Sequence, residues 1–359
     1  MAAERVRLNE KPKAKGKEHP VKASISKGGN YFAEEKESID FISTGCTTLD
    51  MALGGGWARK RIFNIVGDKS TGRTLQVIEA TANFAKKYPD GVIEYREEES
   101  AFDKPYAAAL GMPLDRINFG RGEPMGTVEE FARDLEMVAK RQLAVPDKKR
   151  QPVFYALDSL DSLSDEAEQE REVGQATYGM AKAKNLSEFF RKNVGKLARA
   201  DITLGVVSQV RSKVDVSYGR KTTRAGGRAL DFYASQVLYL QHVGTLSKTI
   251  AGMKRATGIA IKAKVDKNKV GLPFREAIYD ILFGFGVDDA RSCVEWLAEA
   301  KGLDYVGLKA SNYKEYLDKD LPKMSDADYR KEVAELQAAV RKRWVEVDTS
   351  FMPTRQKYA

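Results

Sequence analysis

The chain has 359 residues, 42% hydrophobic and 31% charged, and its 60 Lys and Arg against 51 Asp and Glu give a net charge of +9. This length can bury the core of one large or two modest domains, and no apolar run approaches the roughly 18–20 residues that cross a bilayer. No signal-peptide pattern opens the chain, and two cysteines and two histidines are too few for a zinc site or a disulfide framework, so we expect a cytoplasmic protein without a membrane partner. The positive net charge favours a polyanionic partner.

The first segment is basic and poor in apolar residues. Residues 1–30 are rich in Lys, Pro and Gly, which predicts an extended arm over residues 1–40. Such an arm can contact phosphates or a neighbouring subunit, or have no fixed structure. Oligomerisation is the role that we expect for it.

Residues 41–290 alternate between apolar strands and helix-length segments. The helical segments are 73–87, 127–142 and 177–199. The predicted strands are 61–67, 91–97, 152–160, 201–210, 235–243, 257–267 and 274–284. Several strands are continuous apolar runs, as in strands that are buried on both faces. The alternation predicts an α/β fold with a mainly parallel sheet covered by helices, and the closely spaced last strands predict an antiparallel edge.

Residues 291–359 predict a small helical C-terminal region. Ser325 and Asp328 have the spacing of a capping box at a helix start. A stripe of apolar residues follows on one helical face, which favours packing over binding. The stripe is Tyr329, Val333, Leu336, Val340 and Trp344.

The sequence "GDKSTGRT" has the spacing of a phosphate-binding loop between a strand and a helix. Gly67 and Gly72 allow backbone N–H groups to face phosphate oxygens, and the hydroxyl of Thr74 is a magnesium ligand in this motif. Position 73 is Arg where the motif has Lys. The predicted nucleotide-binding residues are Gly67, Asp68, Lys69, Ser70, Thr71, Gly72, Arg73, Thr74 and Leu75.

A carboxylate ends the predicted strand at 152–160. In "VFYALDSL" this residue is Asp158, and a strand end beside a phosphate loop is the usual place for the group that holds the Mg²⁺ shell. Alone, it could be an ordinary solvated aspartate. Together with the loop and the strand alternation, it predicts a magnesium–nucleotide site.

Four segments resemble the RecA recombinase family of bacteria. They are "ISTGCTTLDMALGGG" (42–56), "EESAFDKPYAAALG" (98–111), "SQVRSKVDVSYGRKTTRAGGRALDFYAS" (208–235) and "VDKNKVGLPF" (265–274). The resemblance is collinear over roughly residues 40–290. The divergent termini suggest a phage-encoded or otherwise distant member.

The resemblance implies ATP and Mg²⁺ as cofactors and assigns roles around the nucleotide. Glu99 corresponds to the carboxylate that positions the attacking water, although Glu97 and Glu98 leave the choice open by charge alone. Asp103 and Tyr106 correspond to adenine contacts, and their spacing selects Glu99.

The same resemblance implies a switch and an interface. Gln209 corresponds to a residue that senses the γ-phosphate and relays its presence to DNA-binding loops. Lys267 and Lys269 correspond to cations that reach a neighbouring subunit's nucleotide, and a Lys-rich turn is the alternative. Asp231, beside Phe232, replaces a residue that is usually basic in the family, so the subunit interface is expected to differ.

Residues 211–228 carry six cations and one acid. The glycines make this segment flexible, and it cannot bury a hydrophobic core of its own. Its cations and backbone N–H groups can instead contact the phosphates of a nucleic acid. The resemblance makes it the second DNA-binding loop. The predicted DNA-binding residues here are Arg211, Lys213, Val214, Tyr218, Arg220, Lys221, Arg224, Gly226, Gly227 and Arg228. The weaker match at 172–184 predicts a first loop, although an acidic run precedes it. Its residues are Tyr178, Gly179 and Met180, followed by Lys182, Lys184 and Arg191 on a helix.

These features predict a recombinase that binds ATP between subunits. It would form a helical filament on single-stranded DNA and pair that strand with a homologous duplex. Arg73 is planar and wider than Lys, so retained ATP binding with slow hydrolysis is expected. The alternatives are an ATP-binding, weakly hydrolysing DNA-coating filament and, less favoured, a ring helicase motor.

Overall fold

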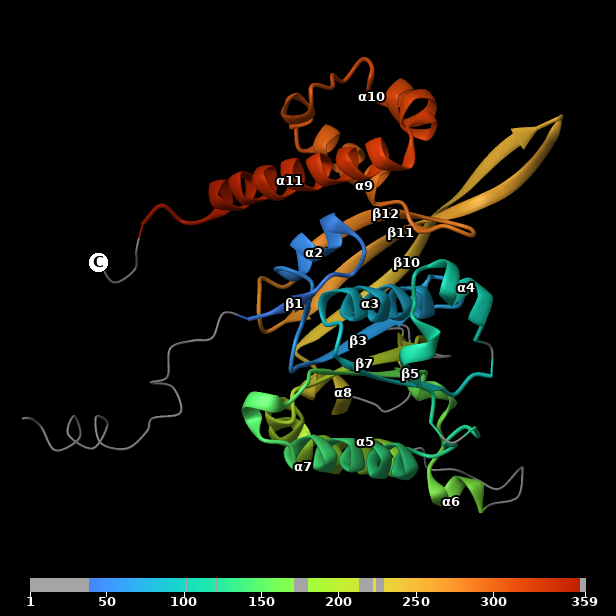
Figure 1. The fold of residues 1–359 in the computed structure, drawn as a ribbon, viewed down its shortest axis with the longest axis vertical. Coiled ribbons are helices and arrows are strands. Elements are labelled where there is room, and N and C mark those ends of the chain that lie inside the picture. Colours follow the sequence, from blue (N-terminus) through green and yellow to red (C-terminus); the bar gives the residue numbers. More distant parts are fainter. Residues whose placement is uncertain are drawn as a thin grey trace, which may run out of the picture. The chain divides into compact units, whose positions relative to one another are not determined.

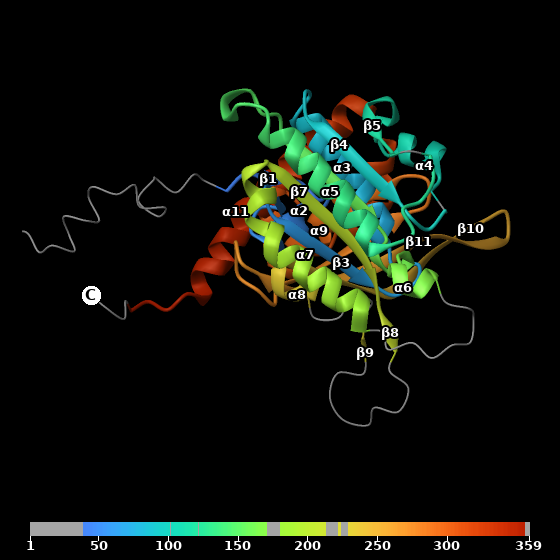
Figure 2. The same cartoon turned by 90° about the horizontal axis from the view of Figure 1, so that it is seen from below.

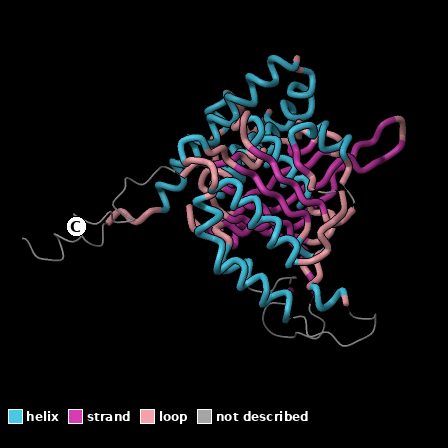
Figure 3. The backbone as a smooth tube through the Cα atoms, turned by 60° about the horizontal axis from the view of Figure 1, so that its bottom comes forward, coloured by secondary structure: helices cyan, strands magenta, loops and turns pink. Residues whose placement is uncertain are grey.

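The computed structural model describes residues 39–100, 102–120, 122–170, 180–212, 222–223 and 229–355. Within these residues, the centre is a nine-stranded sheet with the order β13-β12-β11-β10-β3-β7-β6-β4-β5 (Figure 1). Helices lie on both faces of this sheet (Figure 3). The predicted α/β class is confirmed.

The strands from β10 to β5 in this order pair in parallel. They are β3 (Ile62–Gly67), β4 (Val92–Glu97), β5 (Ile117–Asn118), β6 (Val153–Asp158), β7 (Ile202–Gln209) and β10 (Gln236–Ile250). Every residue of β3 and β6 is buried, because parallel strands in the middle of a sheet are covered on both faces. Successive side chains of β3 therefore enter two different cores, with Phe63 in one and Ile62 in the other.

The other edge of the sheet is antiparallel, as predicted. It consists of β10, β11 (Met253–Asn268), β12 (Glu276–Leu282) and β13 (Gly286–Val287). The hairpin of β10 and β11 is longer than the strands predicted at 235–243 and 257–267. The prediction ended where the apolar pattern ends, whereas backbone pairing continues to a tight turn at Ala251 and Gly252, both with positive φ.

Two layers of helix cover the sheet, and Figure 2 shows α5 and α7 lying over one face of the sheet. The apolar sides of α5 and α7 share a core with β6 and β7, while α2 and α3 share the other core with β11 and β12. Helix α3 spans the predicted 73–87, and α5 begins behind a capping box formed by Thr127 and Glu130. The helices are α2 (Thr47–Leu53), α3 (Arg73–Lys87), α4 (Lys104–Ala109), α5 (Val128–Leu143), α6 (Glu166–Gln169), α7 (Met180–Arg199) and α8 (Ala229–Tyr233).

Short strand pairs complete the described fold. β1 (Phe41–Ile42) pairs with β2 (Trp57–Ala58), and β8 (Arg211–Ser212) pairs with β9 (Thr222–Thr223). The first pair lies next to the core that α2 and α3 cover, because Ile42 and Trp57 are both buried there. The second pair continues from the end of β7.

The C-terminal region is helical, as its pattern predicts. It contains α9 (Asp289–Glu299), α10 (Tyr313–Glu315) and α11 (Asp326–Phe351). Ser325 caps α11 by accepting a hydrogen bond from the backbone N–H of Asp328. The predicted stripe packs inward: Leu336 and Val340 are buried, and Trp344 stacks on Trp296 with 5.1 Å between ring centroids.

Gly205 in β7 provides a test of the central packing. A Cβ there would lie 2.5 Å from Cζ of Phe63, whose ring stacks on Trp57 at 4.1 Å. We expect Gly205→Ala to lower the free energy of unfolding by about 1–3 kcal/mol, because an overpacked core forces side chains off their rotamers. Urea unfolding measures the change.

The control is Gly195→Ala on α7, where a Cβ has no neighbour within 4 Å. Alanine should leave stability unchanged or raise it by up to about 1 kcal/mol, because glycine weakens a helix interior. Equal unfolding free energies for the two variants would contradict the packing described for Phe63.

Candidate nucleotide-binding site

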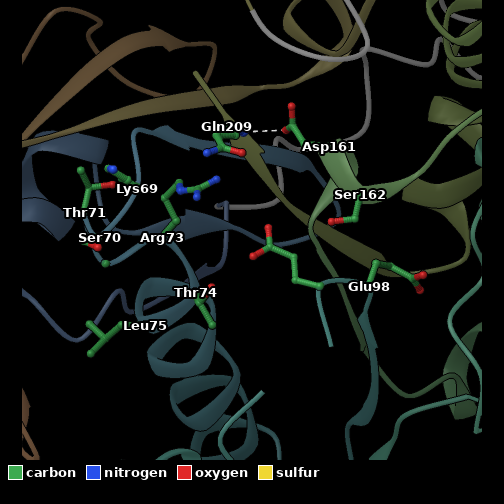
Figure 4. Close-up of a pocket in the computed structure, with 12 residues that line it drawn as sticks. Lys69, Ser70, Thr71, Arg73, Thr74, Leu75, Glu98, Asp161, Ser162 and Gln209 are labelled. Carbon is green, nitrogen blue, oxygen red and sulfur yellow. Dashed lines mark hydrogen bonds between the residues drawn. The ribbon is translucent and has the colours of Figure 1, made fainter. Parts of the chain in front are cut away.

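A cavity of about 640 Å³ opens where the carboxyl ends of β3, β4, β6 and β7 meet (Figure 4). Ligands of open α/β sheets bind at this edge. The cavity is lined by Lys69, Ser70, Thr71, Gly72, Arg73, Thr74, Leu75, Glu98, Glu99, Asp161, Ser162 and Gln209. The sequence therefore predicted most of these residues. The lining residues that it did not predict are Glu98, Asp161 and Ser162.

The phosphate loop has the backbone that its glycines predict. Gly72 has φ of 80° and caps the start of α3, a conformation that residues with a Cβ rarely adopt. A Cβ at Gly67 would collide with Oγ1 of Thr71 and lie 3.1 Å from the carbonyl oxygen of Leu240. The 15-residue helix α3 thus presents its N-terminus, with its free N–H groups, to the cavity.

Arg73 is the first residue of α3, and Figure 4 shows its guanidinium group pointing into the cavity. Within the described residues, its Nη1 is buried and has no hydrogen-bond partner. A buried N–H without an acceptor costs about 1–3 kcal/mol. A phosphate oxygen is the acceptor that this geometry fits, so the site is suited to a nucleotide despite the change from lysine.

Asp158 ends β6 and is 2% exposed. One oxygen accepts a hydrogen bond from Tyr95 Oη at 3.1 Å, whereas the buried Oδ1 has no hydrogen-bond partner among the described residues. Burial raises the pKa of Asp158 to about 6, and a hydrogen bond with Thr74 opposes that rise. A carboxylate and a hydroxyl on adjacent elements fit the shell of a magnesium ion that also binds phosphates.

No group of three or more His, Cys, Asp or Glu side chains that could hold a metal alone occurs in the described part of the chain. This is consistent with Mg²⁺, because it usually binds through one or two carboxylates and the phosphates of the nucleotide. Thr74 and Asp158 are therefore the residues that would hold it.

Glu97 ends β4, and Glu98 and Glu99, which follow it directly, differ in their contacts. Glu98 accepts hydrogen bonds from the backbone N–H of Met125 at 2.8 Å and of Gly126 at 3.4 Å, which fixes its carboxylate. Glu99 lines the cavity and accepts one hydrogen bond from Ser159 Oγ at 2.5 Å. The geometry favours Glu99 as the group that faces a water molecule, and its catalytic role remains a prediction.

Gln209 ends β7, paired directly with Gly67 of the phosphate loop. Its side chain lines the cavity, and its backbone N–H donates to Oδ2 of Asp161 at 2.6 Å (Figure 4). Sequence reasoning missed Asp161. The signal was the second acid in "LDSLDS", three residues after Asp158, which places it on the turn that leaves the same strand end.

The predicted adenine contacts lie on α4. Asp103 caps this helix, accepting from the backbone N–H of Tyr106 at 3.0 Å, and Tyr106 packs against the core covered by α3. Burial raises the pKa of Tyr106. Neither residue lines the cavity described here, so their contact with a base remains a prediction.

Lys267 and Lys269 lie at the end of β11, outside this cavity's lining. The amine of Lys267 donates to the backbone carbonyl oxygens of Asp231 and Phe232 in α8 of the same chain. Their predicted role at a neighbour's nucleotide remains a prediction.

Most predicted DNA-binding residues lie outside the described residues. They are Tyr178, Gly179, Lys213, Val214, Tyr218, Arg220, Lys221, Arg224, Gly226, Gly227 and Arg228. Met180 begins α7 and Arg211 begins β8, and Arg191 is exposed on α7.

One prediction for α7 is wrong. Lys182 is only 9% exposed, and its amine donates to the carbonyl oxygens of Leu160 and Leu163. It is buried because the first turn of α7 packs against the turn after β6, so it cannot contact DNA phosphates in this arrangement. Lys184 is exposed and keeps that possibility.

Comparison with known families shows that residues 16–288 match the RecA N-terminal domain. The chain belongs to the RecA family. Protein RecA of Synechococcus sp. (strain CC9311) is 36% identical over 268 residues, which are 74% of this chain and 64% of that protein. Protein RecA of Nostoc punctiforme (strain ATCC 29133 / PCC 73102) is 34% identical over 265 residues, which are 74% of this chain and 68% of that protein.

The chain spans about two thirds of the length of these RecA relatives. The family match begins before the predicted start near residue 40 and includes the phosphate loop, Asp158, Gln209 and the end of β11. The helical region from α9 onward lies beyond it.

The membership and the cavity together predict how Arg73 contributes to nucleotide binding. We expect Mg²⁺–ATP to raise the melting temperature of the unmodified protein. Arg73→Met should weaken ATP binding about 10- to 100-fold, because one or two charge-assisted hydrogen bonds to phosphate are lost. Thermal shift and calorimetric titration measure these effects.

Lys86→Met is the matched control, because Lys86 is an exposed cation in the last turn of the same helix. It should bind ATP like the unmodified protein. An Arg73→Met variant that folds and binds ATP with unchanged affinity would show that the phosphates lie elsewhere.

Proposed function

We propose that the protein is an ATP-dependent recombinase that assembles as a homo-oligomeric filament on single-stranded DNA. Its further partner is a homologous duplex, with which the bound strand is exchanged, and its expected compartment is the cytoplasm. One observation carries the proposal: Gln209 enters the nucleotide cavity at the end of the strand that leads into the basic segment 211–228. Membership of the RecA family supports it.

Hydrolysis requires a group that orients water and cations that stabilise charge on the transferred phosphate. ATP with Mg²⁺ supplies the phosphoanhydride bond and the metal charge. Ser159 donates to one oxygen of Glu99, which turns the carboxylate toward the cavity and leaves its second oxygen to accept a proton from water. Thr74 and Asp158 would hold the Mg²⁺ ion, and Arg73 would bind phosphate oxygens.

The subunit interface is proposed on the side of α8 and the end of β11. Phe232 is 70% exposed there, and Lys267 holds the carbonyl oxygens beside it. An aromatic side chain this exposed suits a contact with a second copy, because aromatic residues are enriched at protein interfaces. Lys267 and Lys269 would then lie near the neighbour's phosphates.

Arg73 favours a second candidate function, a filament that binds ATP and hydrolyses it weakly. Its guanidinium group is a planar fork, so it can bind ground-state phosphates bidentately yet fit the transition state less well than an ammonium group. This candidate has the same fold, DNA segment and interface. It differs only in turnover.

The roles of the glutamates can be separated by two amide variants. Glu99→Gln should lower kcat about 100-fold or more while retaining ATP binding, because the amide cannot accept the proton of water. Glu98→Gln should keep kcat within a few-fold, because its amide oxygen still accepts from Met125 and Gly126. Measured kcat and calorimetric affinity for both variants test the assignment. The reverse pattern would assign catalysis to Glu98.

Arg73→Lys tests the proposed reaction itself. Turnover of ATP should depend on single-stranded DNA, and the lysine variant should turn over about tenfold faster or more, because a misfitted cation can cost 100-fold in rate. The measurements are ATP hydrolysis with and without single-stranded DNA and strand exchange with a homologous duplex.

Binding without turnover that lysine restores would support the weakly hydrolysing filament. Equal, rapid turnover by both proteins would show that the loop accommodates arginine. Absence of strand exchange by both, despite ATP and DNA binding, would overturn the recombinase proposal.

A further inference from the structure

The turn formed by residues 160–163 contacts three functional parts of the chain. It leaves the strand that ends at Asp158, and Asp161 and Ser162 line the nucleotide cavity. Oδ2 of Asp161 accepts a hydrogen bond from the backbone N–H of Gln209 at 2.6 Å. The buried amine of Lys182 holds the carbonyl oxygens at both ends of the turn.

Both of these contacts are close in sequence to the predicted DNA-binding loops. Gln209 is followed by Val210 and β8, and then by residues 213–221 of the predicted second loop. Lys182 lies in the first turn of α7, directly after the predicted first loop. The turn is therefore fixed to the chain beside each loop.

The end of β7 is held from two sides. On one side, the N–H of Val210 donates to the carbonyl oxygen of Gly67 in the phosphate loop at 3.1 Å. On the other side, Asp161 holds the N–H of Gln209. Release of one contact while the other remains would turn the strand end and move the residues that follow.

The hydrogen bond between Asp161 and Gln209 is the one of these two contacts that a nucleotide can displace. Asp161 lines the same cavity as Arg73, so a bound triphosphate brings negative charges nearer to its carboxylate. Like charges in a partly dehydrated cavity repel by an amount that depends on their separation, whereas Arg73 and the magnesium side attract the phosphates. Phosphate and the Asp161–Gln209 hydrogen bond are therefore in competition.

We propose that Asp161 is a positioning residue that holds Gln209 in the nucleotide-free protein and releases it when a triphosphate enters the cavity. The release couples ATP binding to the conformation of the DNA-binding segment. This inference rests on the proposed ATP-dependent DNA binding. It adds the residue that sets the resting state, and a ligand shifts the equilibrium only by its unequal affinity for the two states.

Two substitutions at Asp161 separate its hydrogen bond from its charge. Asp161→Ala removes the acceptor, so the nucleotide-free protein should bind single-stranded DNA about tenfold more tightly. Asp161→Asn keeps an acceptor oxygen but loses the charge. The nucleotide-free variant should therefore bind single-stranded DNA as tightly as the unmodified protein does. The factor by which the nucleotide raises DNA affinity should shrink about fivefold or more. The asparagine variant should also bind the nucleotide more tightly.

The experiment measures the anisotropy of labelled oligo(dT) with and without Mg²⁺–adenylyl-imidodiphosphate, a non-hydrolysable ATP analogue. Glu166→Gln is the charge control, since Glu166 is an exposed acid outside the cavity. It should show the coupling of the unmodified protein. Melting temperatures of all variants check folding. If Asp161 had a purely structural role, its substitution would change the melting temperature without the changes in DNA affinity expected for the alanine and asparagine variants.

The coupling ratio is the DNA affinity with the nucleotide divided by the DNA affinity without it. A lower ratio in both Asp161 variants would support the inference. In the alanine variant the ratio should fall because the nucleotide-free protein binds DNA more tightly, and in the asparagine variant because the nucleotide-bound protein binds DNA less tightly. Coupling in the unmodified protein that both variants retain would overturn the inference and leave the proposed function intact. If the nucleotide did not change the DNA affinity of the unmodified protein, both this inference and the proposed function would be overturned.

Discussion

The register of the parallel strands is the constraint on which the rest of the structure depends. Glu97 pairs with Asp158, so β4 and β6 end together, and Gly67 pairs with Gln209, so β3 and β7 end together. Because Leu157 pairs with Val206, the ends of β3 and β7 extend two residues beyond Asp158. Each strand end then contributes a different group to one site: a glutamate follows β4, the carboxylate of Asp158 ends β6, the amide of Gln209 ends β7 and the phosphate loop follows β3. A shift of one residue in any of these strands would turn its side chains to the opposite face. Because the two faces of the sheet pack in separate cores, such a shift would disrupt the side-chain packing on both sides.

The charge balance of the cavity follows from this convergence. Acids arrive from β4 and from the turn after β6, whereas Arg73 is provided by the first turn of α3. Arg73 Nη1 and Asp158 Oδ1 are both buried without hydrogen-bond partners among the described residues. A cation and a carboxylate that each keep one buried polar atom without a partner at this site are suited to a ligand that carries phosphate and a divalent metal together.

The sequence was sufficient for the parallel core, because continuous apolar runs and a glycine loop have direct structural meanings. The same patterns put Arg73 and Gln209 in the lining of the cavity, with Asp158 at the end of β6, and their roles there stay predictions. The hairpin of β10 and β11 was predicted too short, since its outer residues pair through the backbone and bury no apolar face. Asp161 and Lys182 were missed or misassigned because their contacts join turns and helices distant in sequence. An acid in a turn and a lysine on a helix are usually solvated, so pattern alone favoured the surface reading.

In the proposed coupling, the nucleotide cavity and the DNA-binding segment share one conformational equilibrium. The most direct test is reciprocity: single-stranded DNA must raise the affinity for the ATP analogue by the same factor that the analogue raises DNA affinity. Calorimetric titration of Mg²⁺–adenylyl-imidodiphosphate into the unmodified protein, with and without saturating oligo(dT), measures that factor. We expect an increase of about fivefold or more, within the usual range of coupling energies. Equal affinities with and without DNA would contradict it.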